Sequence, residues 1–454
     1  MSRSCDEYRL ATGLVPRPGG QTRRVSAGLI ALFASCFFPV PSSLAAADPG
    51  PAEGPIRKLT GKHITLLTDL PSAEAIDELP AVFDKAVPQY CAYFGVSASR
   101  CENWRVTGCV MKDQAVFRRL GLLPERIPPF SNGYSYSLDL WICDQPSDYY
   151  RRHLLLHEGV HSFMNSILGA TGPPWYAEGL AELLGTHRWK DGQLTLGSFP
   201  ANREEVPMWG RIKIVRDAFA ARHAKRFADV LAYDPRTQPG NEFYGWCWAL
   251  AAFLDGHPRY QARFRKLPQW VRQLDLTERF QRLMGEDWSR VAEEWQVFVA
   301  DLEYGYDLRR TAIDFAPGQP LAPGGTRITV HADRGWQNAG VILEAGVKYR
   351  LRAAGRYQVA DKPQIWWSEP NGVSIRYYRG RPLGILLAVV RPDPPVPGPS
   401  PWLSPVSIGL GGELAPKHSG TLFLRINDSA AELNDNAGTL AVEVKEAGET
   451  KDER

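Results

Sequence analysis

The period of the hydrophobic pattern changes once along the chain, at a segment rich in proline and glycine that spans residues 316–325. Before this segment, apolar residues recur mostly at the spacing of amphipathic helices. After it, apolar residues recur at every second position, most clearly at Tyr349, Leu351 and Ala353, at Leu422, Leu424 and Ile426, and at Leu440, Val442 and Val444. Because side chains on a strand point to opposite faces in turn, the pattern predicts a largely helical part followed by an all-β part.

The length of 454 residues is too great for one ordinary hydrophobic core and favours two or three domains. Short apolar runs beside a helical stretch, between residues 56 and 144, indicate a small α/β subdomain. We therefore expect an α+β domain followed by an all-β jelly-roll or β-sandwich domain. The expected segments are an export signal at 1–47, an N-terminal α/β subdomain at 48–146, a helical subdomain at 147–315, a linker at 316–325 and a β-sandwich at 326–454.

The first 47 residues have the pattern of an export signal: two arginines, an apolar run from Val25 to Phe38, and three alanines before Asp48. An apolar run of about 14 residues is too short to cross roughly 30 Å of hydrocarbon. We therefore expect no transmembrane span in the mature chain and a periplasmic, cell-surface or secreted location. Cys36 leaves a lipoprotein anchor open.

The formal net charge of the chain, +3, comes from the expected export signal. Residues 1–47 hold five arginines against Asp6 and Glu7, a surplus of three that accounts for the whole charge of the chain. A near-neutral remainder without a block of lysine and arginine gives no electrostatic reason to expect nucleic acid as a partner.

The sequence HEGVH occupies residues 157–161, inside a stretch of helical periodicity from Asp148 to Leu168. Two histidines four residues apart lie on one face of a helix, so both imidazoles can reach one ion at about 2.0 to 2.1 Å. His157 and His161 are therefore candidate metal ligands. Glu158 flanks the same position and can take a proton from a water molecule as general base.

A catalytic tetrahedral site needs a third protein ligand and an open fourth position. A second short helix is predicted to follow Pro173 and Pro174, and it carries Glu178 as the candidate third ligand. Glu182 lies four residues further on the same face, where its carboxylate could orient a ligand histidine. His153 shares the helical face of the histidine pair, and we interpret it as a surface or orienting residue. The alternative is a chance match of histidines and charges on a solvent face.

The segments HEGVH and WYAEGLAELL resemble the gluzincin peptidases, and most closely the peptidase MA-like group. The resemblance extends over roughly residues 55–305, although its specific motifs are short. It implies a zincin-like catalytic domain, Zn2+ as cofactor and a peptide or protein substrate. It also implies that the glutamate of the second segment, Glu178 here, is the third zinc ligand.

Two further site residues follow from this resemblance. Tyr244 opens an apolar helix at the place where gluzincin aminopeptidases carry a tyrosine that stabilises the oxyanion; the alternative is a tyrosine packed in the core. Asn132 and Gly133 precede the metal-binding helix at the place of the edge strand on which zincins bind an extended peptide. The acidic motif that reads a free amino terminus is not visible, so the choice between endopeptidase and exopeptidase stays open.

Oxygen-bearing residues cluster near the C-terminus. Calcium takes about six to eight oxygen ligands, and Asp428, Asp435, Asn436 and the backbone carbonyl of Glu432 could supply several. This stretch resembles the PA-I-type galactophilic lectins, which implies Ca2+ as a second cofactor and galactose-type sugars or glycoproteins as partners. The alternative is a hairpin turn capped by asparagine and aspartate side chains.

Three functions are consistent with these patterns. The first is an exported zinc metallopeptidase directed to glycans or glycoproteins by its C-terminal domain. The second is a carbohydrate-binding or adhesion protein on a zincin scaffold, although such a scaffold has no need of a general base at Glu158. The third is another zinc hydrolase using the same site.

If the protein is exported, some of its cysteines can form disulfides. Export permits disulfides among Cys91, Cys101, Cys109 and Cys143. Cys247 lies between two tryptophans in an apolar helical pattern and is expected to be a buried free thiol.

Overall fold

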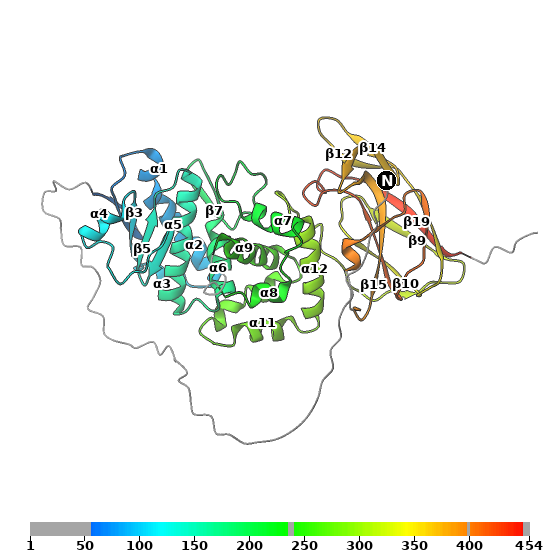
Figure 1. Ribbon diagram of the computed structural model, residues 1–454, viewed down its shortest axis with the longest axis horizontal. Coiled ribbons are helices and arrows are strands. Elements are labelled where there is room, and N and C mark those ends of the chain that lie inside the picture. The colour runs from blue at the N-terminus through cyan, green and yellow to red at the C-terminus, as the bar shows by residue number, and fades with distance from the viewer. Residues whose placement is uncertain (1–55, 235–239, 397–399, 448–454) are drawn as a thin grey trace, which may run out of the picture. The chain divides into compact units, whose positions relative to one another are not determined.

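The computed structural model describes residues 56–234, 240–396 and 400–447. The expected export signal at residues 1–47 lies outside the described residues. Within the described ranges, no helix combines the length and the apolar character needed to cross a bilayer. We refer to residues 56–315 as the N-terminal part and to residues 316–447 as the C-terminal part (Figure 1).

The N-terminal part begins with a five-stranded sheet in the order β1-β2-β3-β5-β4. Strands β2, β3 and β5 run parallel, whereas β4 is antiparallel to β5 and forms an edge of the sheet. Apolar residues of the parallel strands are buried beneath helix α2, Leu79–Phe94. The strands are β1 Arg57–Thr60, β2 Ile64–Thr68, β3 Val106–Met111, β4 Gly133–Tyr136 and β5 Asp139–Cys143.

The helix predicted over residues 148–168 forms as α5, Asp148–Phe163, followed by a π-helical turn, Met164–Leu168. The Ser147 hydroxyl caps its first turn by accepting from the Tyr150 amide at 3.2 Å. Gly169 ends the helix with a φ of +84°, a conformation that glycine adopts without strain. Helix α5 packs against α2, and the Tyr90 hydroxyl of α2 donates to the Leu156 carbonyl of α5 at 2.9 Å.

Helix α6, Pro174–Gly185, packs against both α5 and α9, Asn241–Gly256. Gly179 permits the close approach of α9, because a Cβ there would lie 3.0 Å from the Cys247 carbonyl oxygen. The remaining elements of this part are α1 Glu74–Asp77, α3 Ala98–Cys101, α4 Gln114–Arg119, β6 His187–Lys190, β7 Gln193–Leu196, α7 Arg211–Ala220, α8 Phe227–Leu231, α10 Gln261–Phe264, a 3-10 turn Leu267–Trp270, α11 Leu276–Met284 and α12 Asp287–Asp301.

The C-terminal part is rich in β-structure, as the period-two pattern predicted. Two sheets, ordered β14-β15-β18-β10-β8 and β17-β11-β19-β9, share one hydrophobic core, in which Leu351 and Val442 meet Leu386 and Leu424. The principal strands are β9 Thr326–His331, β10 Gln337–Leu343, β11 Tyr349–Ala354, β14 Asn371–Tyr378, β15 Arg381–Pro392, β17 Gly411–Leu414, β18 Gly420–Ile426 and β19 Thr439–Glu446. Shorter elements are β8 Gln319–Pro320, β12 Tyr357–Ala360, β13 Trp366–Ser368, a 3-10 turn Pro401–Leu403 and β16 Val406–Ser407.

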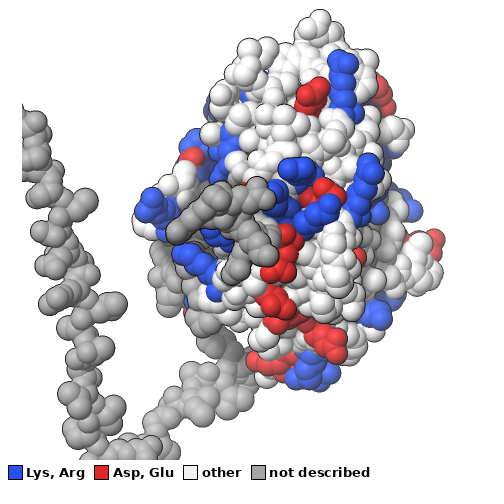
Figure 2. Space-filling model, turned by 90° about the vertical axis from the view of Figure 1, so that its right-hand side faces the viewer, with Lys and Arg blue, Asp and Glu red and all other residues white. Residues whose placement is uncertain are grey.

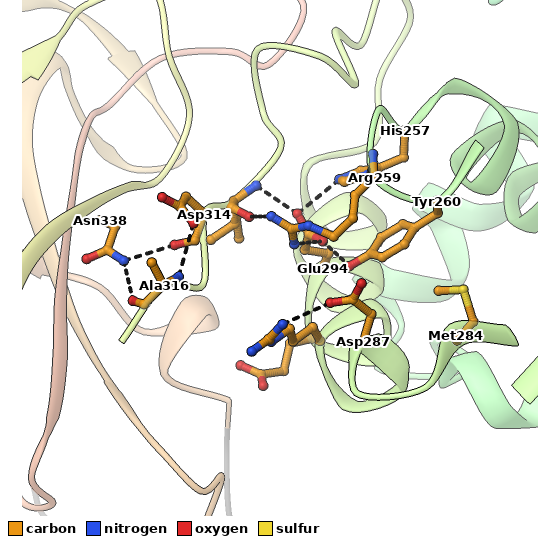
Figure 3. Close-up of polar contacts among 12 residues, drawn as sticks. His257, Arg259, Tyr260, Met284, Asp287, Glu294, Asp314, Ala316 and Asn338 are labelled. Carbon is orange, nitrogen blue, oxygen red and sulfur yellow. Dashed lines mark hydrogen bonds and ion pairs between the residues drawn. The ribbon is translucent and has the colours of Figure 1, made fainter. Parts of the chain in front are cut away.

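Hydrogen bonds and strand pairing hold the chain where the two parts meet. The Glu294 carboxylate accepts hydrogen bonds from the Ile313 amide at 2.7 Å and from the Tyr260 hydroxyl, and it lies 3.0 Å from His257 Nε2 (Figure 3). The Asn338 amide group donates to the Asp314 and Ala316 carbonyls at 3.1 and 2.6 Å. Strand β8, inside the expected linker, pairs with β10. Residues 313–320 therefore contact both parts.

The face of the protein shown in Figure 2 carries both positive and negative side chains. Figure 2 shows lysines and arginines next to aspartates and glutamates on this face. Ion pairs with solvent-accessible side chains occur in the described chain, such as Arg376 with Glu432 at 2.8 Å.

Candidate metal centre

Two elements bring three candidate ligands together. His157 and His161 project from one side of α5, and Glu178 comes from α6. His157 Nε2 lies 3.2 Å from His161 Nε2 and 3.3 Å from Glu178 Oε2, and the His161–Glu178 distance is 3.4 Å. Their side chains are 7, 13 and 23% exposed, respectively, so solvent reaches the group from the side of Glu178. One ion could contact all three atoms.

His157 and Glu178 shift each other's pKa values toward the charged forms. Burial raises the pKa of Glu178, but the charges and hydrogen bonds of His161 and His157 outweigh burial and hold this pKa below its usual range. Burial lowers the pKa of His157, yet its contacts with Glu178 and Glu182 raise it well above the ordinary value. Protons therefore compete with a metal for the same nitrogen atoms, and metal binding will depend on pH.

Glu158 lies against the edge strand. Its carboxyl group is buried and faces β4 at Gly133, where a Cβ would overlap Oε1 and lie 3.0 Å from both Cδ and Cγ. Burial raises the pKa of Glu158 despite the opposing charges of His157 and His161. Asn132 directly precedes β4, and its carbonyl accepts from the Cys143 amide at 2.7 Å. The expected base and the expected substrate strand are thus in direct contact.

An arginine that the sequence reasoning missed completes the centre. The Arg211 guanidinium donates to both Glu182 oxygens, at 2.8 and 2.9 Å, and all of these groups are buried. Glu182 Oε1 lies 3.4 Å from His157 Nδ1. Burial raises the pKa of Glu182, but Arg211 and His153 outweigh it and hold the carboxylate ionised. The apolar neighbours Trp209, Ile212 and Val215 could have indicated that this arginine faces the core.

His153 is a correction to the surface interpretation, because it is fully buried. Its Nε2 lies 3.4 Å from Glu182 Oε2, and its ring stacks on Tyr150 with centroids 5.6 Å apart. Gly185 makes room for the ring, since a Cβ there would lie 3.0 Å from His153 Cε1. His153, His157 and Glu182 could also hold a metal by proximity. Arg211 already pairs with both oxygens of Glu182, and burial lowers the pKa of His153, so we interpret this second group as a support for His157 instead of a second metal site.

Tyr244 lies beside the metal group in the first turn of α9. Its ring centroid is 6.1 Å from that of His157, and the Arg211 guanidinium lies 5.6 Å above the ring. Burial and the surrounding carboxylates raise the pKa of its hydroxyl, which therefore stays protonated and able to donate a hydrogen bond.

The C-terminal candidates form a separate oxygen-rich group. Asp428 is fully buried and accepts hydrogen bonds from the Ser429 amide at 2.7 Å and from the Asn436 side chain at 2.9 Å. Burial raises its pKa to about 7. Oδ1 of Asp435 and Oδ1 of Asn436 are buried without a hydrogen-bond partner among the described residues. The Glu432 carbonyl accepts from the Asp435 amide at 3.2 Å. These oxygens could serve a cation.

No protein-family model matches the chain, and no curated protein matches it. A solved structure described as EclA N-terminal domain, a PllA-like lectin, has 23% identity and a TM-score of 0.20, over 26% of this chain and 94% of its own. IMPa from Pseudomonas aeruginosa, in complex with an O-glycopeptide, has 14% identity and a TM-score of 0.17, over 58% of this chain and 26% of its own. An aminopeptidase N family protein from Idiomarina loihiensis has 9% identity and a TM-score of 0.27, over 86% of this chain and 68% of its own. Likenesses at these TM-scores are weak and do not establish a family.

Proposed function

We propose that this chain is an exported zinc metallopeptidase in which His157, His161 and Glu178 hold Zn2+. The spacing of the three ligand atoms carries the proposal. A tetrahedral zinc ion with bonds of about 2.0 to 2.1 Å separates its ligand atoms by about 3.3 to 3.4 Å. The three atoms are 3.2, 3.3 and 3.4 Å apart. Two imidazoles and one carboxylate are also a donor set that suits zinc.

The neighbouring residues divide the work of peptide hydrolysis. Bound zinc supplies a Lewis acid that polarises the scissile carbonyl. Glu158 takes a proton from the attacking water and returns it to the leaving amine, a role that its raised pKa favours. The Tyr244 hydroxyl donates a hydrogen bond to the developing oxyanion. The open edge of β4 at Asn132 and Gly133 binds the substrate in extended form.

The C-terminal part is proposed to bind Ca2+ through Asp428, Asp435 and Asn436, and through calcium a galactose-type sugar. The supporting observation is the pair of buried oxygens that lack partners in the described chain, beside a buried carboxylate. Asp428 accepts two hydrogen bonds, yet burial still raises its pKa to about 7, so a bound cation would stabilise its charged form. Sugar binding would direct the peptidase to glycans or glycoproteins.

Comparison of the wild type with Glu158→Gln tests the catalytic proposal. Zinc content is measured together with cleavage of a mixed peptide library. We expect zinc in both proteins, and a loss of activity on the order of 10² to 10⁴-fold in the variant. Glu178→Ala should lower the zinc content, whereas Glu125→Ala, a change at an exposed glutamate, should not.

Other outcomes would favour the other functions. Equal cleavage by both zinc-loaded proteins would contradict the role of Glu158. Hydrolysis of esters or epoxides without peptide cleavage would indicate another zinc hydrolase. Sugar retention without any hydrolysis would indicate a carbohydrate-binding protein. Export is tested separately, by fractionating cells that produce the full chain and a variant lacking residues 1–47.

A further inference from the structure

Two cysteines of the N-terminal part lie unusually close together. Cys91, in the last turn of α2, and Cys101, at the end of α3, have their sulfur atoms 2.8 Å apart, and both residues are buried. Atoms of this size that are not bonded prefer separations of at least about 3.5 to 4.0 Å. A disulfide has a sulfur–sulfur bond of about 2.05 Å. A shift of less than an ångström would therefore relieve the contact by forming a bond.

We propose that Cys91 and Cys101 form a disulfide in the mature, exported protein. The two thiols lose two protons and two electrons, and a sulfur–sulfur bond forms between them. The electrons pass by thiol–disulfide exchange to an external disulfide, of a small molecule or of an oxidising protein, which is reduced to two thiols. An extracytoplasmic compartment supplies such oxidants, whereas the cytosol keeps thiols reduced.

A cavity gives this pair a route to solvent. Its volume is about 350 Å³, and its lining includes Cys91, Cys101, His63 and Asp84. Burial raises the pKa of the Cys91 thiol to about 12, so the reactive thiolate is scarce once α2 and α3 have docked. The bond should therefore form most readily during folding, before the sulfurs are enclosed.

The other described cysteines have different surroundings. Cys143 accepts a hydrogen bond from the Gln114 side chain at 3.0 Å, and Cys109 lies 4.0 Å from the Leu122 carbonyl. Cys247 is buried in α9. The close approach of Cys91 and Cys101 selects one pairing among those that export would permit.

The bond would join two segments that each form hydrogen bonds to α5, the helix that carries His157 and His161, or to the turn that follows it. Cys91 follows Tyr90, which bonds the middle of α5 through the Leu156 carbonyl. Cys101 belongs to the segment that holds the end of this helix, where Arg100 donates to the Ile167 carbonyl at 2.6 Å and Trp104 donates to the Ser166 hydroxyl at 2.9 Å. The disulfide therefore constrains the platform of the metal centre. This consequence rests on the proposed zinc site, whereas the bond itself rests only on the proposed export.

Peptide mapping of the full chain tests the proposal. The reduced, unfolded protein is refolded in a buffer of glutathione and glutathione disulfide, its free thiols are alkylated under denaturing conditions, and it is cleaved with trypsin. Arg100 separates the two cysteines, so a disulfide would join peptide 86–100 to peptide 101–105. We expect this linked pair, and its loss on reduction. Alkylation of both peptides, or a link from either one to another cysteine, would overturn the proposal.

A stability measurement supplies the second readout. Closing a loop of about eleven residues should raise the melting temperature by an amount on the order of 5 to 10 °C. Reduction should remove this increment from the wild type and from the control Cys143→Ser. A Cys91→Ser/Cys101→Ser variant should melt at the same temperature with and without reductant. Zinc content, measured in parallel, separates this result from any failure of the proposed metal site.

Discussion

Replacing Arg211 by methionine probes the buried charge network behind the metal ligands. The substitution removes both hydrogen bonds to Glu182, at 2.8 and 2.9 Å, and leaves a buried carboxylate without its counterion. Breaking a buried ion pair by removing one partner costs about 3 to 5 kcal/mol. In a domain of this size, the melting temperature should fall by roughly 6 to 20 °C. Urea unfolding of the metal-free protein, in a chelator, measures this loss.

The double variant Arg211→Met/Glu182→Leu separates stability from metal binding. Replacing both charges by apolar groups of similar size is often neutral, so most of the lost stability should return. His157 Nδ1, however, then lacks the carboxylate that lies 3.4 Å away in the wild type. Loss of such an orienting partner typically weakens metal affinity by about 10- to 100-fold. A zinc competition titration should therefore find weak binding in a protein of nearly normal stability.

A matched control is Arg282→Met, at an arginine whose pair with Asp275 is exposed. Exposed pairs contribute about 0 to 1 kcal/mol, so this variant should unfold almost like the wild type. The reasoning would be refuted if Arg211→Met were no less stable than the control. It would also be refuted if the double variant bound zinc as tightly as the wild type.

Four further outcomes are expected. Gly133→Ala should displace the Glu158 carboxyl group and lower kcat on the order of 10²-fold, with zinc content unchanged, because the new Cβ occupies the position of Oε1. Tyr244→Phe should lower turnover on the order of 10²-fold without loss of zinc or melting temperature; a variant that is unstable yet fully active would identify a packing residue. In the full chain, calcium should raise the melting temperature and promote retention on a galactose matrix, and Asp435→Ala should abolish both effects; stabilisation without retention would indicate a structural calcium site. Burial lowers the pKa of His187 in the folded protein to about 3, whereas in the unfolded chain it is about 6.5. As the pH falls from about 6.5 to about 3, only the unfolded chain binds the proton, so the folded protein loses stability over this range. At pH 4.5 the loss from this residue should be about 2 to 3 kcal/mol relative to pH 7, and urea unfolding in chelator should find a correspondingly smaller loss in His187→Gln.

Local periodicity made several features readable from the sequence. His157 and His161 share a helix face because they are four residues apart, and the helix itself follows from its apolar spacing. The strands after residue 325 follow equally from alternation. Such features depend on neighbours along the chain, where spacing alone decides direction.

Features that join distant segments were decided by tertiary packing. The pairing of Arg211 with Glu182, the burial of His153 beside Gly185, and the contact of Glu158 with Gly133 each depend on which faces of separate elements meet. The sequence named Glu158 and Gly133 as site residues but carried no sign that they touch. Spacing likewise left the cysteine pairing open. An amphipathic pattern specifies that a face is buried, whereas the partner of that face is selected by the packing of the whole core.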